Sequence, residues 1–196
     1  MFELSLAIHK PNTSARFIKL ASEVVMQNLP PDSQKHIQHE PTKRDRAMST
    51  FTETIEIDAP VAKVWATLAD IGSIADWNPG LVGSQATNNS IGLGATRVCD
   101  IDGKHNLDEE VVQFEPERAI TFRITRSTLP FRSADIRFTL KAKGERAVVS
   151  VSPDYALKFG FVGRLLDRAI VLPAYRRGMR GLLTGLKEST EAFKKL

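Results

Sequence analysis

The residues of this sequence best suited to chemistry are a carboxylate and a guanidinium in two neighbouring strand-like segments. Glu110 is in register with Val112 and Phe114, and the alternation of a strand therefore points all three toward an apolar interior. A carboxylate buried there needs a partner, or it takes up a proton. Glu110 could anchor the hydroxyl or carbonyl group of a ligand, or it could pair with Arg97. A register error of one residue would put Glu109 in its place.

Arg97 stands in the preceding strand-like segment, where it alternates with Cys99 and Ile101. If this face is the inner one, Arg97 enters the interior and favours a ligand with a negative charge or a carbonyl group; the alternative is an arginine on the surface. Cys99 is the only cysteine, so no disulfide can form within the chain. Its surroundings indicate a packed thiol, because no histidine or other activating group is spaced to make it a nucleophile.

The sequence predicts neither a metal site nor a cofactor. It contains four histidines, which are His9, His36, His39 and His105. Only His36 and His39 have a spacing that metal ligands use, and no further ligand lies near them. The sequence also has no G-x-S-x-G motif, no P-loop and no dinucleotide-binding fingerprint.

The composition is that of an ordinary soluble globular protein. Of 196 residues, 42% are hydrophobic and 26% are charged, and no apolar run is long enough to span a bilayer. The net charge of +4, from 27 basic and 23 acidic residues, is too balanced for the clustered positive surface of a nucleic-acid-binding protein. We therefore predict no nucleic-acid partner and no stable membrane insertion. A single cysteine fits a reducing, cytoplasmic location.

Residues 1–49 differ from the rest and are predicted to form a poorly structured extension. Residues 16–29 could form one short amphipathic helix, which Pro30 and Pro31 would end, and residues 32–47 are polar, as in an exposed linker. The segment lacks the features of a signal peptide. Because Met48 directly precedes the first strand-like segment, we hypothesise that it is the natural start, and that the folded domain occupies residues 50–196.

From residue 50 onward the sequence predicts a regular order of elements. One strand is followed by two short helices, six strands with short turn-like connections, and a long helix over residues 161–195 that Pro173 kinks or splits. Short connections require antiparallel neighbours. The seven predicted strands cover residues 51–57, 81–87, 95–101, 106–114, 119–126, 132–142 and 146–155.

The faces of these strands predict a hollow between the sheet and the long helix. Phe122 alternates with polar neighbours on one strand, and Ile136 and Phe138 do so on the next, so each strand has one apolar and one polar face. A curved sheet closed by one helix often leaves space for an apolar ligand; the alternative is a fully packed interior. Further residues predicted to line the hollow are Val112, Leu166 and Met179, with Tyr155 and Tyr175 as lining or core residues.

Five local motifs accompany this order of elements: I-x-I-D-A-P-V-A-K-V-W at residues 55–65, D-W-N-P at 76–79, G-A-T-R at 94–97, E-E-V-V-Q-F-E-P-E-R at 109–118 and G-R-L-L-D-R at 163–168. Together they resemble the START-like (SRPBCC) superfamily, and in particular its polyketide cyclase/dehydrase branch. The resemblance implies an α+β helix-grip fold. In this fold a seven-stranded curved antiparallel sheet wraps around a long C-terminal helix, and two short helices follow the first strand.

The resemblance leaves the function open, because one fold serves many functions. The leading interpretation is a noncatalytic protein that binds or transports a small hydrophobic ligand, such as a lipid, an isoprenoid, a quinone or a polyketide-like molecule, because the inward face is apolar, has few polar anchors and carries no assembled acid–base set. Trp77 would then stand at the cavity mouth, or else cap the core. A competing interpretation is an enzyme similar to aromatase/cyclases and dehydratases, in which Glu110, Arg97 and Tyr155 orient a poly-keto chain and move protons.

A third interpretation concerns the arginines of the last predicted helix. They could form its solvated face, or they could make transient contact with anionic lipid headgroups or with an acidic protein. These residues are Arg164, Arg168, Arg176, Arg177 and Arg180.

Overall fold

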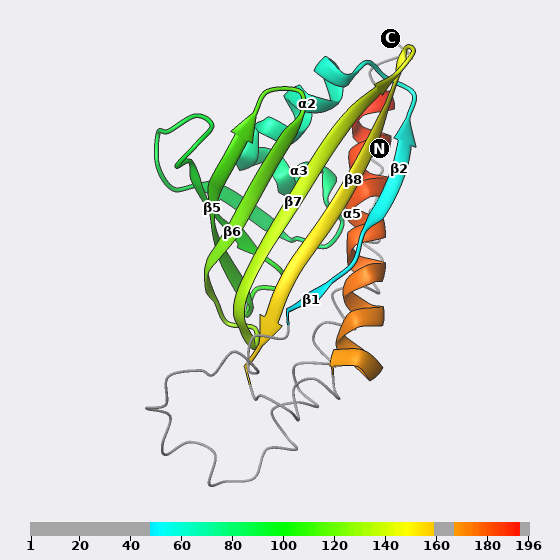
Figure 1. Cartoon of the computed structure of the whole chain (residues 1–196). Helices are drawn as coiled ribbons and strands as arrows, with labels where there is room; N and C mark the ends of the chain where they lie inside the picture. The colour runs from blue at the N-terminus through cyan, green and yellow to red at the C-terminus, as the bar shows by residue number, and fades with distance from the viewer. Residues whose placement is uncertain (1–47, 159–166, 193–196) are drawn as a thin grey trace, which may run out of the picture.

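The computed structural model describes residues 48–158 and 167–192. The predicted extension over residues 1–47 and the first part of the predicted long helix, with Arg164 and Leu166, lie outside these described residues. The described part is an α+β fold, in which a curved antiparallel sheet lies against one long helix and short helices lie near one end (Figure 1). This is the predicted helix-grip architecture.

The helices and strands follow one another in the predicted order. After the first strands come the helix α2 (Val61–Ala69), the 3-10 helix η3 (Ile71–Ser73) and the helix α3 (Ile74–Trp77). The described part ends in the π-helical turn η4 (Asp167–Val171) and the helix α5 (Leu172–Ala192). The strands are β1 (Ser49–Thr50), β2 (Glu53–Ile57), β3 (Gly83–Ala86), β4 (Thr96–Asp100), β5 (Asn106–Glu115), β6 (Ala119–Ser127), β7 (Phe131–Lys143) and β8 (Arg146–Leu157).

The strand pairings among the described residues are antiparallel, in the order β1-β8-β7-β6-β5-β4-β3, with β2 also paired to β8. The single predicted first strand is thus divided into two short strands, and both lie along β8 at the same edge of the sheet. The short hairpin connections account for this meander, because they can join only antiparallel neighbours.

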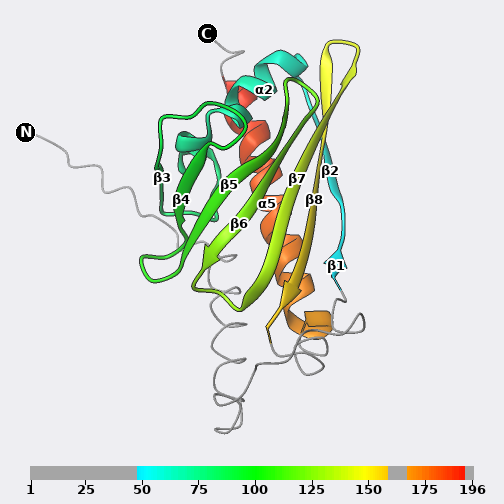
Figure 2. The same ribbon diagram turned by 60° about the vertical axis from the view of Figure 1, so that its left-hand side comes forward.

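The two faces of the sheet differ in the way that the alternation predicts. The side chains of Phe122, Ile136 and Phe138 are buried on the inner face. On the outer face, Arg123 donates two hydrogen bonds of 2.9 Å to the Asp135 carboxylate. Figure 2 shows α5 crossing behind the curved sheet, so the core lies between the inner face and this helix.

Strand β5 contains a β-bulge that changes which of its side chains face inward. Val111 pairs with Phe122 on β6, and Gln113 pairs with Thr121, which leaves Val112 as an extra residue on the bulged strand. A bulge of this kind breaks the strict two-residue alternation of side chains along a strand. The orientations of the residues before and after Val112 must therefore be counted separately.

The bulge overturns the predicted orientation of Glu110. If side chains alternated strictly from Phe114 backward, Glu110 would point inward. The extra residue Val112 shifts this alternation by one position for the residues that precede it. Glu109 therefore points inward with Val111, and it is 4% exposed. Glu110 pairs with Arg123 on the outer face of the sheet.

Helix α5 begins at Leu172, directly after the π-helical turn η4, and Pro173 is its second residue. Proline has no N–H group to donate to the preceding turn, so a regular α-helix cannot continue through it without a break. The predicted interruption at Pro173 lies at this junction.

The C-terminal half of α5 is packed closely against the short helices. A Cβ atom added to Gly185 would lie 1.8 Å from the backbone oxygen of Trp77, so this approach requires glycine. Trp77 is buried, and it belongs to the same core cluster as Val64 and Leu186, which are fully buried. This half of the helix therefore holds α5 against the rest of the fold.

Candidate functional site

A hollow lies between the N-terminal half of α5 and the inner face of the sheet. Its volume, counted as the space open to the centre of a water molecule, is about 130 Å³. One water molecule needs roughly 10–15 Å³ by this measure, so the hollow is several times larger. Most of its wall is apolar, with side chains that include Phe122, Phe131, Ile136, Phe138, Met179 and Leu182.

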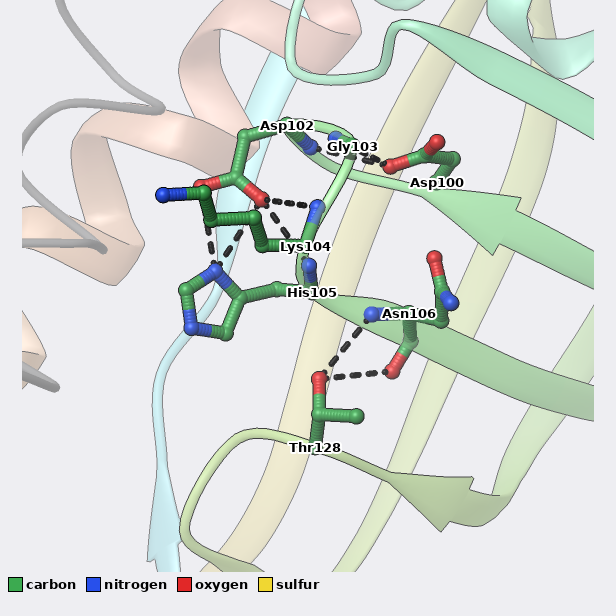
Figure 3. Close-up of polar contacts among 7 residues, drawn as sticks. All are labelled: Asp100, Asp102, Gly103, Lys104, His105, Asn106 and Thr128. Carbon is green, nitrogen blue, oxygen red and sulfur yellow. Dashed lines mark hydrogen bonds and ion pairs between the residues drawn. The ribbon is translucent and has the colours of Figure 1, made fainter.

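The turn between β4 and β5 is held by a network of local hydrogen bonds (Figure 3). Asp100 Oδ1 accepts hydrogen bonds from the backbone N–H groups of Asp102, at 3.1 Å, and Gly103, at 2.6 Å. Partial burial works against a charge on Asp102, but hydrogen bonds from the His105 ring and from the backbone N–H groups of His105 and Lys104 outweigh it and lower the pKa of this carboxyl. A turn held by so many local bonds sets the register of its two strands.

In this register Arg97 on β4 is the direct partner of Glu109 on β5, and the two form a buried ion pair. Arg97 Nε donates to Glu109 Oε2 at 2.7 Å, and each side chain is 4% exposed. Arg97 Nη1 also donates to the Ile71 carbonyl oxygen at 3.2 Å, and the guanidinium carbon lies 4.1 Å from the centroid of the Phe122 ring. Arg97 therefore belongs to the inner face, and three neighbours hold its guanidinium in place.

Two further polar side chains of the wall are uncharged at neutral pH. Burial, and then the charge of Glu109, raises the pKa of the Cys99 thiol to about 12. The same two causes raise the pKa of the Tyr175 hydroxyl. Because the thiolate is the nucleophilic form of cysteine, Cys99 acts here as a packed hydrogen-bond donor, with its Sγ 3.5 Å from Glu109 Oε2.

Five of the residues predicted to bind a ligand border the hollow, and they come from β4, β6, β7 and α5. They are Arg97, Phe122, Ile136, Phe138 and Met179. Of the remaining predicted residues, Leu166 lies outside the described residues.

The other predicted residues lie away from the hollow. Trp77 is packed in the core against α5, Val112 is the bulged residue of β5, and Glu110 faces outward. Tyr155 is buried in the core, where its ring centroid lies 5.1 Å from that of Tyr175. Of these two tyrosines, Tyr175 is the one that borders the hollow.

Sequence reasoning placed Glu110 ahead of Glu109 and missed Asn78 and Gly178 as wall residues. Asn78 precedes a proline and a glycine in the chain, which is a turn signal, and its side chain accepts a hydrogen bond from the Gly80 N–H at 2.9 Å. A Cβ atom added to Gly178 would meet nothing within 4 Å. A glycine within an amphipathic helix was the one signal that could have indicated this gap.

Two of the arginines of α5 bind the edge of the sheet. Arg180 Nε lies 2.8 Å from Glu53 Oε2, and Arg176 Nε lies 3.3 Å from Glu53 Oε1. The Arg176 guanidinium also lies 5.3 Å from the centroid of the Phe51 ring. Part of the predicted arginine face therefore ties α5 to β2. Within residues 48–158 and 167–192, no helix is both long enough and apolar enough to pass through a membrane.

Several solved structures share this fold. A START superfamily protein from Mycobacterium smegmatis superposes with a TM-score of 0.61 and 14% identity, over 74% of this chain and 98% of its own. The ZhuI aromatase/cyclase from a Streptomyces species superposes with a TM-score of 0.58 and 18% identity, over 74% of this chain and 94% of its own. A norcoclaurine synthase variant from Thalictrum flavum, in complex with a transition-state analogue, superposes with a TM-score of 0.60 and 12% identity, over 75% of this chain and 96% of its own. Such low identities establish the fold alone.

A search of curated proteins gave no match. A family model described as polyketide cyclase / dehydrase and lipid transport matches residues 48–191. This match contains all of the described residues except Ala192, the last residue of α5, and it includes the whole wall of the hollow. The chain therefore belongs to the polyketide cyclase / dehydrase and lipid transport family.

Proposed function

We propose that this protein binds a small hydrophobic molecule in the hollow beneath α5 and carries it without changing it chemically. The observation that carries this proposal is the make-up of the wall, which is apolar except for one compensated ion pair and a few neutral polar groups. Walls of this kind suit apolar ligands that have a small polar part. Lipids, isoprenoids, quinones and polyketide-like molecules all have this character.

The apolar wall would also make the binding of such a ligand favourable. A hydrophobic molecule in the hollow would remove its own apolar surface and that of the wall from water, at about 25 cal/mol for each Å² buried, and it would gain dispersion contacts with the wall.

Nile red, a neutral hydrophobic dye, provides a direct test when Gly178 is changed. Gly178→Phe places an aromatic ring in the open space beside the helix, and we expect about tenfold weaker dye binding, measured by fluorescence titration. Gly178→Ala is the matched control, because it makes the same change in the helix backbone but adds only one methyl group; its dye affinity should stay within about twofold of the unchanged protein.

Two results would contradict the proposal. If the dye binds the unchanged protein and Gly178→Phe equally well, the dye site is not the hollow. If the unchanged protein binds no dye, and native mass spectrometry detects no co-purified small molecule, the hollow is not a ligand site under these conditions. Thermal unfolding of each variant would show that a loss of binding is not a loss of fold.

A second candidate function, cyclisation or dehydration of a ligand in the same hollow, is favoured by Glu109. This carboxylate faces the wall together with Arg97 and Tyr175, and it could accept a proton from a bound poly-keto chain. Glu109→Gln separates the two functions. Loss of turnover of a poly-β-ketone with retained Nile red binding would support catalysis, whereas dye binding without turnover in either protein would support the carrier.

A further inference from the structure

The wall of the hollow is electrically neutral although it contains a buried arginine. Among the described residues of the wall, Arg97 is the positive side chain and Glu109 the negative one, and their Nε and Oε2 atoms lie 2.7 Å apart. Cys99 and Tyr175 add no charge at neutral pH, because thiol and phenol groups are protonated there and burial raises the pKa of both groups further. An incoming ligand therefore meets one compensated pair and no net charge.

The Arg97 guanidinium is not available to neutralise an anionic ligand. It already binds Glu109 and the Ile71 carbonyl oxygen, and one of its faces lies on the Phe122 ring. An ionised carboxylate would have to displace Glu109 or bring a second negative charge next to it. Either way one buried carboxylate would lack a counter-charge, which is strongly unfavourable in a site of low polarity.

A neutral polar group finds partners in the same place. Both hydrogen bonds of the Glu109 carboxylate with described residues use Oε2, so Oε1 can accept another. Asn78 uses its Oδ1 to accept from Gly80, so its Nδ2 can donate. A ligand hydroxyl could donate to Glu109 Oε1, and a ligand carbonyl could accept from Asn78 or from the Tyr175 hydroxyl.

We infer that the hollow selects neutral, mainly apolar molecules with a hydroxyl or carbonyl group, and that it rejects anionic ones such as ionised fatty acids. The inference rests on the proposed function, because it concerns which molecules the same hollow accepts. The Arg97–Glu109 pair is the selective element: it presents hydrogen-bonding atoms without presenting a net charge.

Three ligands with one hydrocarbon chain test this selection: decanol, methyl decanoate and decanoate. Their dissociation constants are measured by calorimetric titration of the unchanged protein at neutral pH, where decanoate is ionised. We expect decanol and methyl decanoate to bind at least about tenfold more tightly than decanoate. Methyl decanoate keeps the carbonyl group of decanoate and removes its charge, so the difference between these two ligands isolates the charge.

Glu109→Gln should abolish this preference. The variant keeps the shape of the side chain but leaves the Arg97 charge uncompensated, so decanoate should gain at least about tenfold in affinity relative to decanol. Glu110→Gln is the matched control, because it removes the same charge from the next residue of β5, which faces outward. The control should keep the preference of the unchanged protein.

The inference is overturned if the unchanged protein binds decanoate as tightly as methyl decanoate. In that case the proposed function stands, because both ligands bind. If none of the three ligands binds, and Nile red does not bind either, the proposed function and the inference both fail. If Glu109→Gln does not fold, the comparison of methyl decanoate with decanoate on the unchanged protein still decides the question.

Discussion

Of the three glycines in helix α5, Gly178 in the N-terminal half and Gly185 in the C-terminal half have different surroundings. At Gly185 an added Cβ would lie 1.8 Å from the Trp77 carbonyl oxygen, whereas at Gly178 it would meet nothing within 4 Å. The C-terminal half of the helix is therefore packed against the core, and the N-terminal half forms the roof of the hollow. The comparison shows how one helix can stabilise the fold with one half and leave room for a ligand under the other.

The largest effect on stability is expected from Arg97→Leu, in the wall of the hollow beneath the N-terminal half of α5. The variant leaves the buried Glu109 carboxylate without its partner, and we expect the free energy of unfolding to fall by about 4 kcal/mol in urea denaturation at neutral pH. The loss should shrink as the pH is lowered, because an unpaired buried carboxyl can then take up a proton and become neutral.

Arg123→Leu is the matched control on the outer face. It also breaks an arginine–carboxylate pair between neighbouring strands, but Arg123 and Asp135 are 55% and 37% exposed. Solvent screens such a pair, so the loss should be about 0–1 kcal/mol. Equal losses in the two variants would mean that burial of the Arg97 pair has no special role in stability.

The next largest effect on stability is expected from Gly185→Ala, in the C-terminal half of α5. The new methyl group cannot fit beside the Trp77 carbonyl, so α5 or α3 must move, and we expect a loss of about 3 kcal/mol in thermal or urea unfolding. A change in Trp77 fluorescence should accompany it. A loss below about 1 kcal/mol would mean that the two helices are less closely packed in solution than the structure shows.

The same substitution in the other half, Gly178→Ala, should have the opposite sign. The methyl group meets open space, and alanine favours a helix over glycine, so we expect a gain of up to about 1 kcal/mol in the same unfolding assay. A loss of stability in this variant would remove the contrast between the two halves of α5.

The smallest effect is expected from Glu56→Gln on β2, near the packed half. Hydrogen bonds from Lys143 and Arg146 lower the pKa of Glu56 from 4.5 to about 2. Because the folded pKa lies below the unfolded one, these bonds stabilise the fold above pH 4.5, and the contribution is lost as the pH falls toward about 2. As the pH falls across this range, the melting temperature of the variant should therefore decrease less than that of the unchanged protein. The difference should be small, because the site faces solvent. Identical acid profiles would show that these pairs add nothing to stability.

The element order and the buried faces of the regular strands could be read from the sequence. Phe122, Ile136 and Phe138 alternate with polar residues, and a stretch of strand without an extra residue turns that alternation directly into an inner and an outer face. The long amphipathic helix α5, which begins one residue before Pro173, follows from helical spacing and from the missing N–H of proline. The fold could therefore be predicted from the sequence.

The candidate site was predictable only in part. Alternation along β4 predicted Arg97 as a possible inward residue. On β5 it predicted Glu110 instead of Glu109, because the bulge at Val112 cannot be recognised from the alternation of residue types. For Trp77 the resemblance left two places open, the cavity mouth and a cap over the core, and the residue lies in the core beneath Gly185. The position of a tryptophan after a short helix depends on how closely the next helix approaches.

The sequence by itself determined which segments become strands and helices, and that an apolar sheet face must be covered by the last helix, because these properties follow from local periodicity. Only the tertiary structure decided that Glu109 is the partner of Arg97, and that α5 is packed at Gly185 and open at Gly178. These features depend on register, on the bulge and on the distance between helix and sheet. They are set by contacts between residues far apart in the chain, which no local pattern records.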